Sequence, residues 1–198
     1  MTRRGLIQSI LLAMGLGVST VARAAERLSY DASCRRLIAL GYLDGAEVPP
    51  MPTRLPRYDD AVPGVSFLRQ MVEIADLSGL TLPRTFFGRS EINAVNFSNT
   101  DLSQSNLAWN DFLEVDFSGA SLAGGDLRAS QYLRCRFDGA DLRGADLRRS
   151  TFDNCSFADA LLDGAVATKK QLSARALTAS QWAVIDWRDD EGPEPDGG

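Results

Sequence analysis

Residues 75–164 repeat a pattern every five residues, and this period constrains the fold more than any other feature of the sequence. Residues 140–149, for example, read ADLRGADLRR and so contain nearly the same five residues twice. A period of five fits neither the 3.6-residue turn of an α-helix nor the two-residue alternation of a β-strand. The pattern therefore indicates a chain that changes direction at short, regular intervals.

The third residue of all 18 units is large and apolar, and the first is small or β-branched in nearly every unit. At a hydrophobic content of 44%, such a run would arise by chance on the order of once in a million registers. Two inward positions per unit describe a chain that turns repeatedly around a narrow interior. The large inward residues are Leu77, Leu82, Phe87, Ile92, Phe97, Leu102, Leu107, Phe112, Phe117, Leu122, Leu127, Tyr132, Phe137, Leu142, Leu147, Phe152, Phe157 and Leu162.

The units ADLSG, TDLSQ, VDFSG, ADLRG and ADLRR resemble A(D/N)LXX, the unit of the pentapeptide-repeat family, over just under half of the chain. The resemblance implies an all-β fold, a right-handed quadrilateral parallel β-helix in which four units make one square coil. A 20-residue period should then be visible, and it is, because Phe and Leu segregate when every fourth unit is compared. Side chains stacked at the roughly 4.8 Å spacing of neighbouring strands would show this segregation.

The β-helix is predicted to span residues 65–166, with residues 65–74 as a degenerate first coil. A C-terminal cap should follow at residues 167–187. There Thr168 and Gln171 resemble a capping box that opens a helix through Leu172, Ala176 and Leu177. Residues 188–198 are acidic and rich in Gly and Pro, which predicts a disordered tail.

Residues 25–64 precede the repeats and are expected to contain a short helix and a Pro-rich linker. The helix is predicted over residues 32–40, with Asp31 as its N-cap and Gly41 as its stop. Five prolines between residues 45 and 64 exclude regular hydrogen bonding there. This linker should be extended and poorly ordered unless it packs against the rod.

Residues 1–24 have the order of features found in a signal peptide. Arg3 and Arg4 precede a largely apolar run over residues 6–18, and Ala22-Arg23-Ala24 offers a cleavage site. The apolar run is shorter than the roughly 20 residues that a membrane span requires. We therefore expect a periplasmic or secreted protein cleaved near Ala24. Both the general and the twin-arginine export routes remain open.

The composition excludes several kinds of catalytic site. The chain has no His, and its three Cys show no CxxC spacing, which removes His-dependent nucleophile pairs and zinc sites. We predict a protein that is not an enzyme and that needs no cofactor or metal. Aspartates at the second position of the units should point outward and bond the turns rather than form acid–base or calcium sites.

Cys135 and Cys155 occupy equivalent first positions one coil apart. Their Cα atoms should lie near 4.8 Å, within the range that a disulfide can bridge, although side chains in a parallel ladder point in the same direction. Either a disulfide or two small, packed thiols fits this placement.

Four outward positions are apolar where polar residues are expected, namely Phe86, Trp109, Leu113 and Leu133. Leu113 and Leu133 fall on one side of the coil, with Trp109 at its edge and Phe86 on the side before. An exposed apolar patch containing a Trp indicates a surface for a protein partner or a homodimer. The alternative is that the N-terminal segment or the C-terminal cap folds over it.

Arginines also gather along two adjacent sides of the coil as a basic stripe, comprising Arg84, Arg89, Arg128, Arg143, Arg148 and Arg149. The stripe would either hold an anionic partner or pair with aspartates such as Asp126 and Asp146.

Two functions remain at this point. The first is an exported binding or scaffold protein for an unidentified protein partner. The second, implied by the family resemblance, is a DNA mimic that inhibits or protects a type II topoisomerase such as DNA gyrase. The net charge of −5 fits mimicry and makes nucleic-acid binding unexpected, whereas the basic stripe and the signal sequence argue against mimicry.

Overall fold

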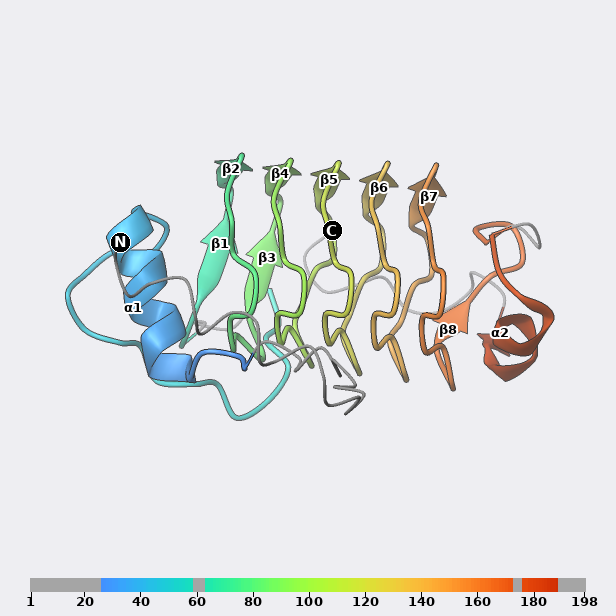
Figure 1. Ribbon diagram of the computed structural model, residues 1–198, viewed down its shortest axis with the longest axis horizontal. Coiled ribbons are helices and arrows are strands. Elements are labelled where there is room, and N and C mark those ends of the chain that lie inside the picture. Colours follow the sequence, from blue (N-terminus) through green and yellow to red (C-terminus); the bar gives the residue numbers. More distant parts are fainter. Residues whose placement is uncertain (1–25, 59–62, 173–175, 189–198) are drawn as a thin grey trace, which may run out of the picture.

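A computed structural model describes residues 26–58, 63–172 and 176–188 (Figure 1). These residues form a right-handed parallel β-helix with helix α1 (Tyr30–Leu40) at one end and helix α2 (Ala179–Val184) at the other. The predicted fold class is confirmed. The predicted signal sequence and all but the first residue of the predicted tail lie outside the described residues.

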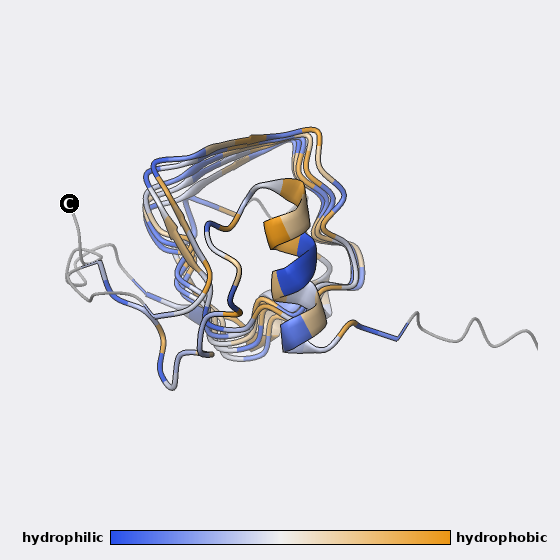
Figure 2. Ribbon diagram, turned by 90° about the vertical axis from the view of Figure 1, so that its left-hand side faces the viewer, coloured by the Kyte–Doolittle hydropathy of each residue, from blue (hydrophilic) through white to orange (hydrophobic). Residues whose placement is uncertain are grey.

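Each coil has four sides, which we call faces 1 to 4, and the view along the rod shows them as a square (Figure 2). Face 1 contains residues 75–79, face 2 residues 80–84, face 3 residues 85–89 and face 4 residues 90–94, and each recurs every twenty residues. The strands are β1 (Ser66–Leu68), β2 (Met71–Glu73), β3 (Phe86–Gly88), β4 (Glu91–Asn93), β5 (Asp111–Leu113), β6 (Gln131–Leu133), β7 (Thr151–Asp153), β8 (Val166–Ala167) and β9 (Asp186–Trp187).

The strand register confirms the 20-residue coil. Face 4 is a five-stranded parallel sheet in the order β2-β4-β5-β6-β7, in which Ile92 pairs with Phe112 and Phe112 with Tyr132. The first coil is also paired, because β1 lies beside β3 and β2 beside β4. Residues 65–74 thus form the degenerate first coil that the sequence predicts, and β2 is left as an edge strand.

Stacked aromatic rings fill half of the interior. On face 1 the rings of Phe117 and Phe137 stack with centroids 5.1 Å apart, and on face 4 those of Phe112 and Tyr132 stack at 4.8 Å. Rings of the two columns meet edge to face, as between Phe112 and Phe117. This arrangement combines offset stacking with T-shaped contacts, both of which are favourable for aromatic pairs. The interior is therefore occupied by the chain's own side chains.

Each corner of the coil is made by the fifth residue of a unit. This residue has a positive φ whether it is glycine, as at Gly139 (65°), or a bulky residue, as at Trp109 (61°). The second residue of many units supports the turn by accepting a hydrogen bond from the N–H two residues later. These acceptors confirm the predicted role of the second position and are Asp76, Asn96, Asp101, Asn106, Asp116, Asp126, Asp141 and Asp146.

Helix α1 covers the N-terminal end of the rod. It begins two residues earlier than predicted, because Ser29 rather than Asp31 is its N-cap and accepts a hydrogen bond from the Ala32 N–H. Gly41 ends it at a φ of 78°, as expected. The Ser33 hydroxyl accepts the Thr81 N–H, so α1 satisfies a backbone group that has no preceding coil.

The Pro-rich segment packs along face 3 instead of hanging free. The Asn106 side chain donates to the Pro56 carbonyl at 3.0 Å, and Arg84 donates to the Pro52 carbonyl at 3.3 Å. The Tyr58 ring meets the Phe86 ring edge to face at 5.8 Å. Residues 52–58 are therefore held to the rod by side chains of the repeats.

The C-terminal cap differs from the predicted one. Thr168 and Gln171 form a turn, and the helix begins ten residues later at α2, where Thr178 and Gln181 make a capping box. The side-chain amide of Gln171 donates to carbonyls of the last coil. Residues 173–175, inside the predicted helix, lie outside the described residues.

The two glutamines close the end of the solenoid in the same way. Gln171 donates to the carbonyls of Leu147 and Ser150, and Gln181 donates to those of Phe157 and Ala160. Strand β9 then pairs with β8 and adds one more rung to face 3. Buried carbonyls that lack a following coil are thereby satisfied.

Candidate binding surface

Face 3 is largely covered, and Phe86 is part of the covered surface. The sequence places Phe86 outward and exposed, but its exposed fraction is 2% because the Pro-rich segment lies over it. Gly88 on the same face leaves room for the Phe86 ring, since a Cβ there would meet it at 2.6 Å. Phe86 is therefore removed from the predicted partner surface, and the alternative of an N-terminal cover is correct at this position.

Leu113 and Leu133 lie side by side on the outer surface of face 4. They are paired residues of β5 and β6, and both side chains are half-buried. On the neighbouring strands, Asn93 of β4 pairs with Leu113 and Asp153 of β7 pairs with Leu133. These two leucines thus form a small apolar patch within a polar row.

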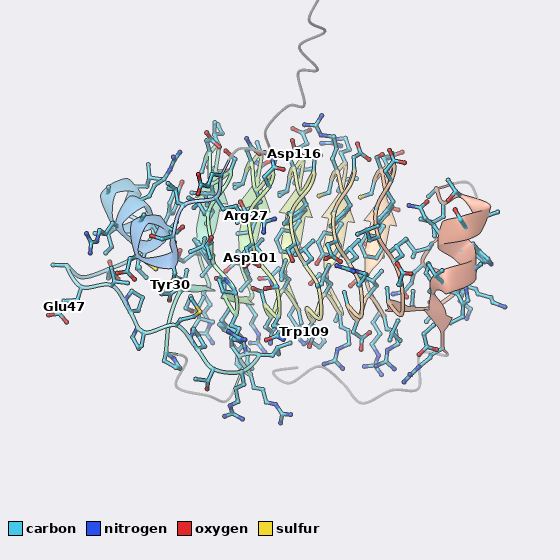
Figure 3. The ribbon with its side chains drawn as sticks, turned by 60° about the horizontal axis from the view of Figure 1, so that its bottom comes forward. Arg27, Tyr30, Glu47, Asp101, Trp109 and Asp116 are labelled. Atoms are coloured by element: carbon cyan, nitrogen blue, oxygen red, sulfur yellow. The ribbon has the colours of Figure 1, made fainter. Side chains whose placement is uncertain are left out.

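Trp109 lies at the corner between faces 3 and 4, on the side of the rod away from Asp116 (Figure 3). It lines a hollow of about 460 Å³ together with Ala129, Ser130, Gln131, Arg149 and Thr151. Its indole Nε1 is buried without a hydrogen-bond partner among the described residues. Trp109 therefore borders face 4 as predicted, but the row of Asp111 and Gln131 separates it from the leucine patch.

Three exposed apolar residues in the first coil were missed by the sequence analysis. The exposed fractions are 46% for Leu68, 64% for Met71 and 86% for Ile74. Later coils carry small or polar residues at most of the equivalent positions, for example Glu91 and Asp111 after Met71. Applying the five-residue period to residues 65–74 would have found them, but that stretch was treated only as an end cover.

A second hollow, of about 340 Å³, lies on face 4 between the first coil and the leucine patch. Met71 and Leu113 form its apolar ends. Its remaining lining comes from Glu73, Glu91, Ile92, Asn93 and Asp111. The outer surface of β2, β4 and β5 thus combines apolar ends with three carboxylates.

Three of the six arginines of the predicted basic stripe, Arg128, Arg143 and Arg148, are paired with aspartates. Arg128 makes two hydrogen bonds to Asp126, at 2.8 and 2.7 Å, and lies 3.7 Å from Asp146. Arg148 binds Asp146 in the same two-pronged way. Asp146 raises the pKa of Arg148 through these bonds. The charge of this part of the stripe is therefore balanced locally.

The remaining arginines of the stripe have other contacts. On face 2, Arg143 makes a two-pronged contact with Asp141 and lowers the pKa of that carboxyl through its hydrogen bonds. Arg84 binds the Pro-rich segment, and Arg89 lies over the Tyr58 ring at 5.3 Å. Arg149 lines the hollow beside Trp109. Most arginines of the stripe thus contact aspartates of the rod or the Pro-rich segment that covers face 3.

Cys135 and Cys155 are free thiols in the structure. The Cys135 thiol donates to the Phe112 carbonyl at 3.5 Å and the Cys155 thiol to the Tyr132 carbonyl at 3.4 Å. Hydrogen bonding with Cys155, together with burial, raises the pKa of Cys135. The alternative of two packed thiols is the one that the structure adopts.

The described residues contain no helix long and apolar enough to cross a membrane. Within the same part of the chain, no three Cys, Asp or Glu side chains are grouped closely enough to hold a metal ion.

Comparison with known proteins agrees with the geometry. A family model for pentapeptide repeats matches residues 75–108 and 134–166, with eight copies of the repeat. No curated protein matches the sequence.

Solved structures with a similar fold include HetL, a pentapeptide repeat protein involved in heterocyst differentiation regulation in the cyanobacterium Nostoc. It is 21% identical with a TM-score of 0.50, and the match covers 52% of this chain and 48% of HetL. This chain thus spans about half the length of HetL, and the likeness shows the fold alone.

Two further matches have lower TM-scores. A pentapeptide repeat protein from the Arabidopsis thaliana thylakoid lumen is 25% identical with a TM-score of 0.33, covering 65% of this chain and 86% of that protein. QnrB1, a plasmid-mediated fluoroquinolone resistance protein, is 15% identical with a TM-score of 0.33, covering 52% and 67%. Residues 75–108 and 134–166 of this chain are thus pentapeptide repeats, and they form square coils of the rod.

Proposed function

We propose that this chain is an exported, non-catalytic binding protein whose face 4 presents a rigid surface to a protein partner. The observation that carries the proposal is the contrast between a filled interior and a five-stranded face, bearing Leu113 and Leu133, that no other segment among the described residues covers. A packed interior leaves no deep site for chemistry, so function falls to the outer surface. Half-buried leucines on a flat, rigid sheet are suited to burial against another protein.

Face 4 is tested by photo-crosslinking from a site on β6 in intact cells, with mass spectrometry of the captured protein. The double variant Leu113→Asp/Leu133→Asp should abolish the crosslink, because a carboxylate would be buried unpaired in the interface. The matched control is Ser103→Asp/Ala123→Asp, at the corresponding positions of face 2. An unchanged crosslink in the leucine variant, with its melting temperature also unchanged, would refute face 4 as the surface.

Export is the second part of the proposal and rests on Arg3, Arg4, the apolar run over residues 6–18 and the Ala22-Arg23-Ala24 site. Cell fractionation followed by intact-mass measurement tests it directly. A periplasmic chain lacking residues 1–24 would support export. A full-length chain in the cytoplasm would reject it.

The charge pattern does not favour DNA mimicry. A mimic needs carboxylates spread along the rod where DNA phosphates would lie. On face 3 the carboxylates of Asp126 and Asp146 are instead neutralised by Arg128 and Arg148. A supercoiling assay with purified gyrase should show no inhibition by this protein, and inhibition at submicromolar protein would favour mimicry.

A further inference from the structure

Charge is distributed unevenly around the rod. Face 4, from residue 70 to residue 154, carries five carboxylates and one arginine, whereas face 3, from residue 85 to residue 149, carries four arginines and two aspartates. The one arginine of face 4, Arg134, is bound to Glu114 at 2.8 Å. The carboxylates of face 4 are Glu73, Glu91, Asp111, Glu114 and Asp153.

Four of these carboxylates, all but Glu114, are exposed and form no ion pair among the described residues, in contrast to the aspartates of face 3. Three of the four, Glu73, Glu91 and Asp111, line the 340 Å³ hollow. The apolar ends of the hollow are Met71 and Leu113. A ligand in the hollow would therefore meet one apolar and one acidic side chain at each end, on β2 and on β5, and Glu91 between them.

The hollow is continuous with an exposed sheet edge. Strand β2 pairs with β4 on one side only, and Ile74 follows it with an exposed fraction of 86%. Natural proteins usually protect an edge of this kind with charged or proline residues. An exposed apolar side chain there, close to Met71, is instead suited to contact with another chain.

We propose that face 4 docks a basic polypeptide segment of a partner protein, an inference that rests on the proposed binding function. Lys or Arg side chains of that segment enter the hollow. Their aliphatic stems lie against Met71 and Leu113, and their cations lie near Glu73, Glu91 and Asp111. Lys and Arg carry both an apolar stem and a charged head, and this matches the lining of the hollow.

The same charges disfavour the other occupants. A second copy joined through face 4 by a two-fold axis would place carboxylates against carboxylates, at a cost to association. Anionic lipid headgroups and nucleic-acid phosphates would be repelled in the same way. A basic segment is the occupant whose charge the surface complements.

The test measures fluorescence anisotropy of a labelled peptide that alternates lysine and leucine, with glutamate–leucine and serine–leucine peptides as charge controls. Of the three peptides, the full-length protein should bind only the lysine peptide. This binding should weaken as the salt concentration is raised. The variant Glu73→Gln/Glu91→Gln/Asp111→Asn should weaken binding about ten-fold, as expected for the loss of three exposed ion pairs.

A matched variant removes three carboxylates from other faces, Asp101→Asn/Asp159→Asn/Asp163→Asn, and should bind the lysine peptide as the unmodified protein does. Met71→Ser/Leu113→Ser should also weaken binding, because the apolar ends of the hollow are lost. Each variant is first shown to melt as the unmodified protein does. No binding by the unmodified protein, or equal weakening in the matched variant, would overturn the proposal.

The inference and the proposed function fail in different experiments. If crosslinking in cells depends on Leu113 and Leu133 but the lysine peptide does not bind, face 4 is a docking surface and its basic occupant is rejected. If the peptide binds as expected but the crosslink is unchanged in the Leu113→Asp/Leu133→Asp variant, the hollow recognises cations and the proposed binding function of face 4 is rejected.

Discussion

Faces 3 and 4 are neighbouring sides of one coil with the same repeat and register, yet their outer surfaces differ completely. Face 3 is covered by residues 52–58 and by its own arginine–aspartate pairs. Face 4 has exposed, unpaired carboxylates and exposed apolar side chains. The repeat therefore determines the backbone and the interior, while a few outward residues determine whether a face is structural or available to a partner.

The largest effect is expected from breaking the ion-pair cluster on face 3. Asp126 has an exposed fraction of 8% and accepts three hydrogen bonds from Arg128. Asp126→Ala should lower the free energy of unfolding by about 2–4 kcal/mol, because the partly buried Arg128 guanidinium loses its two hydrogen bonds to this carboxylate. Urea denaturation measures this loss. The face 4 control, Asp111→Ala, should change stability by less than about 0.5 kcal/mol, and equal losses would contradict the difference between the faces.

Detaching the cover of face 3 should have the next largest effect. Tyr58 shields Phe86 and lies under Arg89. Tyr58→Ala should cost about 1–2 kcal/mol through lost aromatic contact and newly exposed Phe86. Limited proteolysis should then cut near residues 46–58 faster than in the unmodified protein. Unchanged protection would show that Pro52 and Pro56 hold the segment without the ring.

In the interior of face 4, replacing Tyr132 should increase the stability of the protein. The Tyr132 hydroxyl is buried without a hydrogen-bond partner among the described residues, while its stacking neighbours are Phe112 and Phe152. Tyr132→Phe should raise the free energy of unfolding by about 1 kcal/mol, because an unsatisfied polar group is removed and the stack is kept. Thermal melting would reveal it, and a lower melting temperature would indicate that the hydroxyl is satisfied in solution.

The smallest effect is expected on stability at acid pH and concerns Asp141, a paired carboxylate of face 2. Hydrogen bonds from Arg143 lower the pKa of Asp141 below the usual value of 3.8. A lowered pKa in the folded state gives stability that is fully present above about pH 4–5 and is lost as the pH falls through the folded value. Asp141→Asn should therefore flatten the acid side of the stability profile by less than about 1 kcal/mol. An unchanged profile in denaturation series between pH 2 and 6 would contradict this role.

The errors of the sequence analysis fall outside the interior. Phe86 was expected to be exposed, because the repeat does not reveal the cover over face 3. Thr168 was expected to open a helix, because the repeat does not reveal the bonds of Gln171. Met71 and Ile74 were missed because they lie in the imperfect first coil. Leu113 and Leu133 were placed correctly because they lie within regular units.

The sequence by itself determined the 20-residue period and the identity of nearly every inward side chain, and its resemblance to pentapeptide repeats implied the square coil. The period and the inward side chains follow from local repetition, since each inward residue meets its equivalents one coil away whatever the rest of the chain does. Only the tertiary structure decided which faces are covered, how Gln171 and Gln181 close the last coil, and that β9 returns to face 3. These contacts join segments without a repeat to distant parts of the rod, and their free energy depends on side-chain packing that periodicity does not specify.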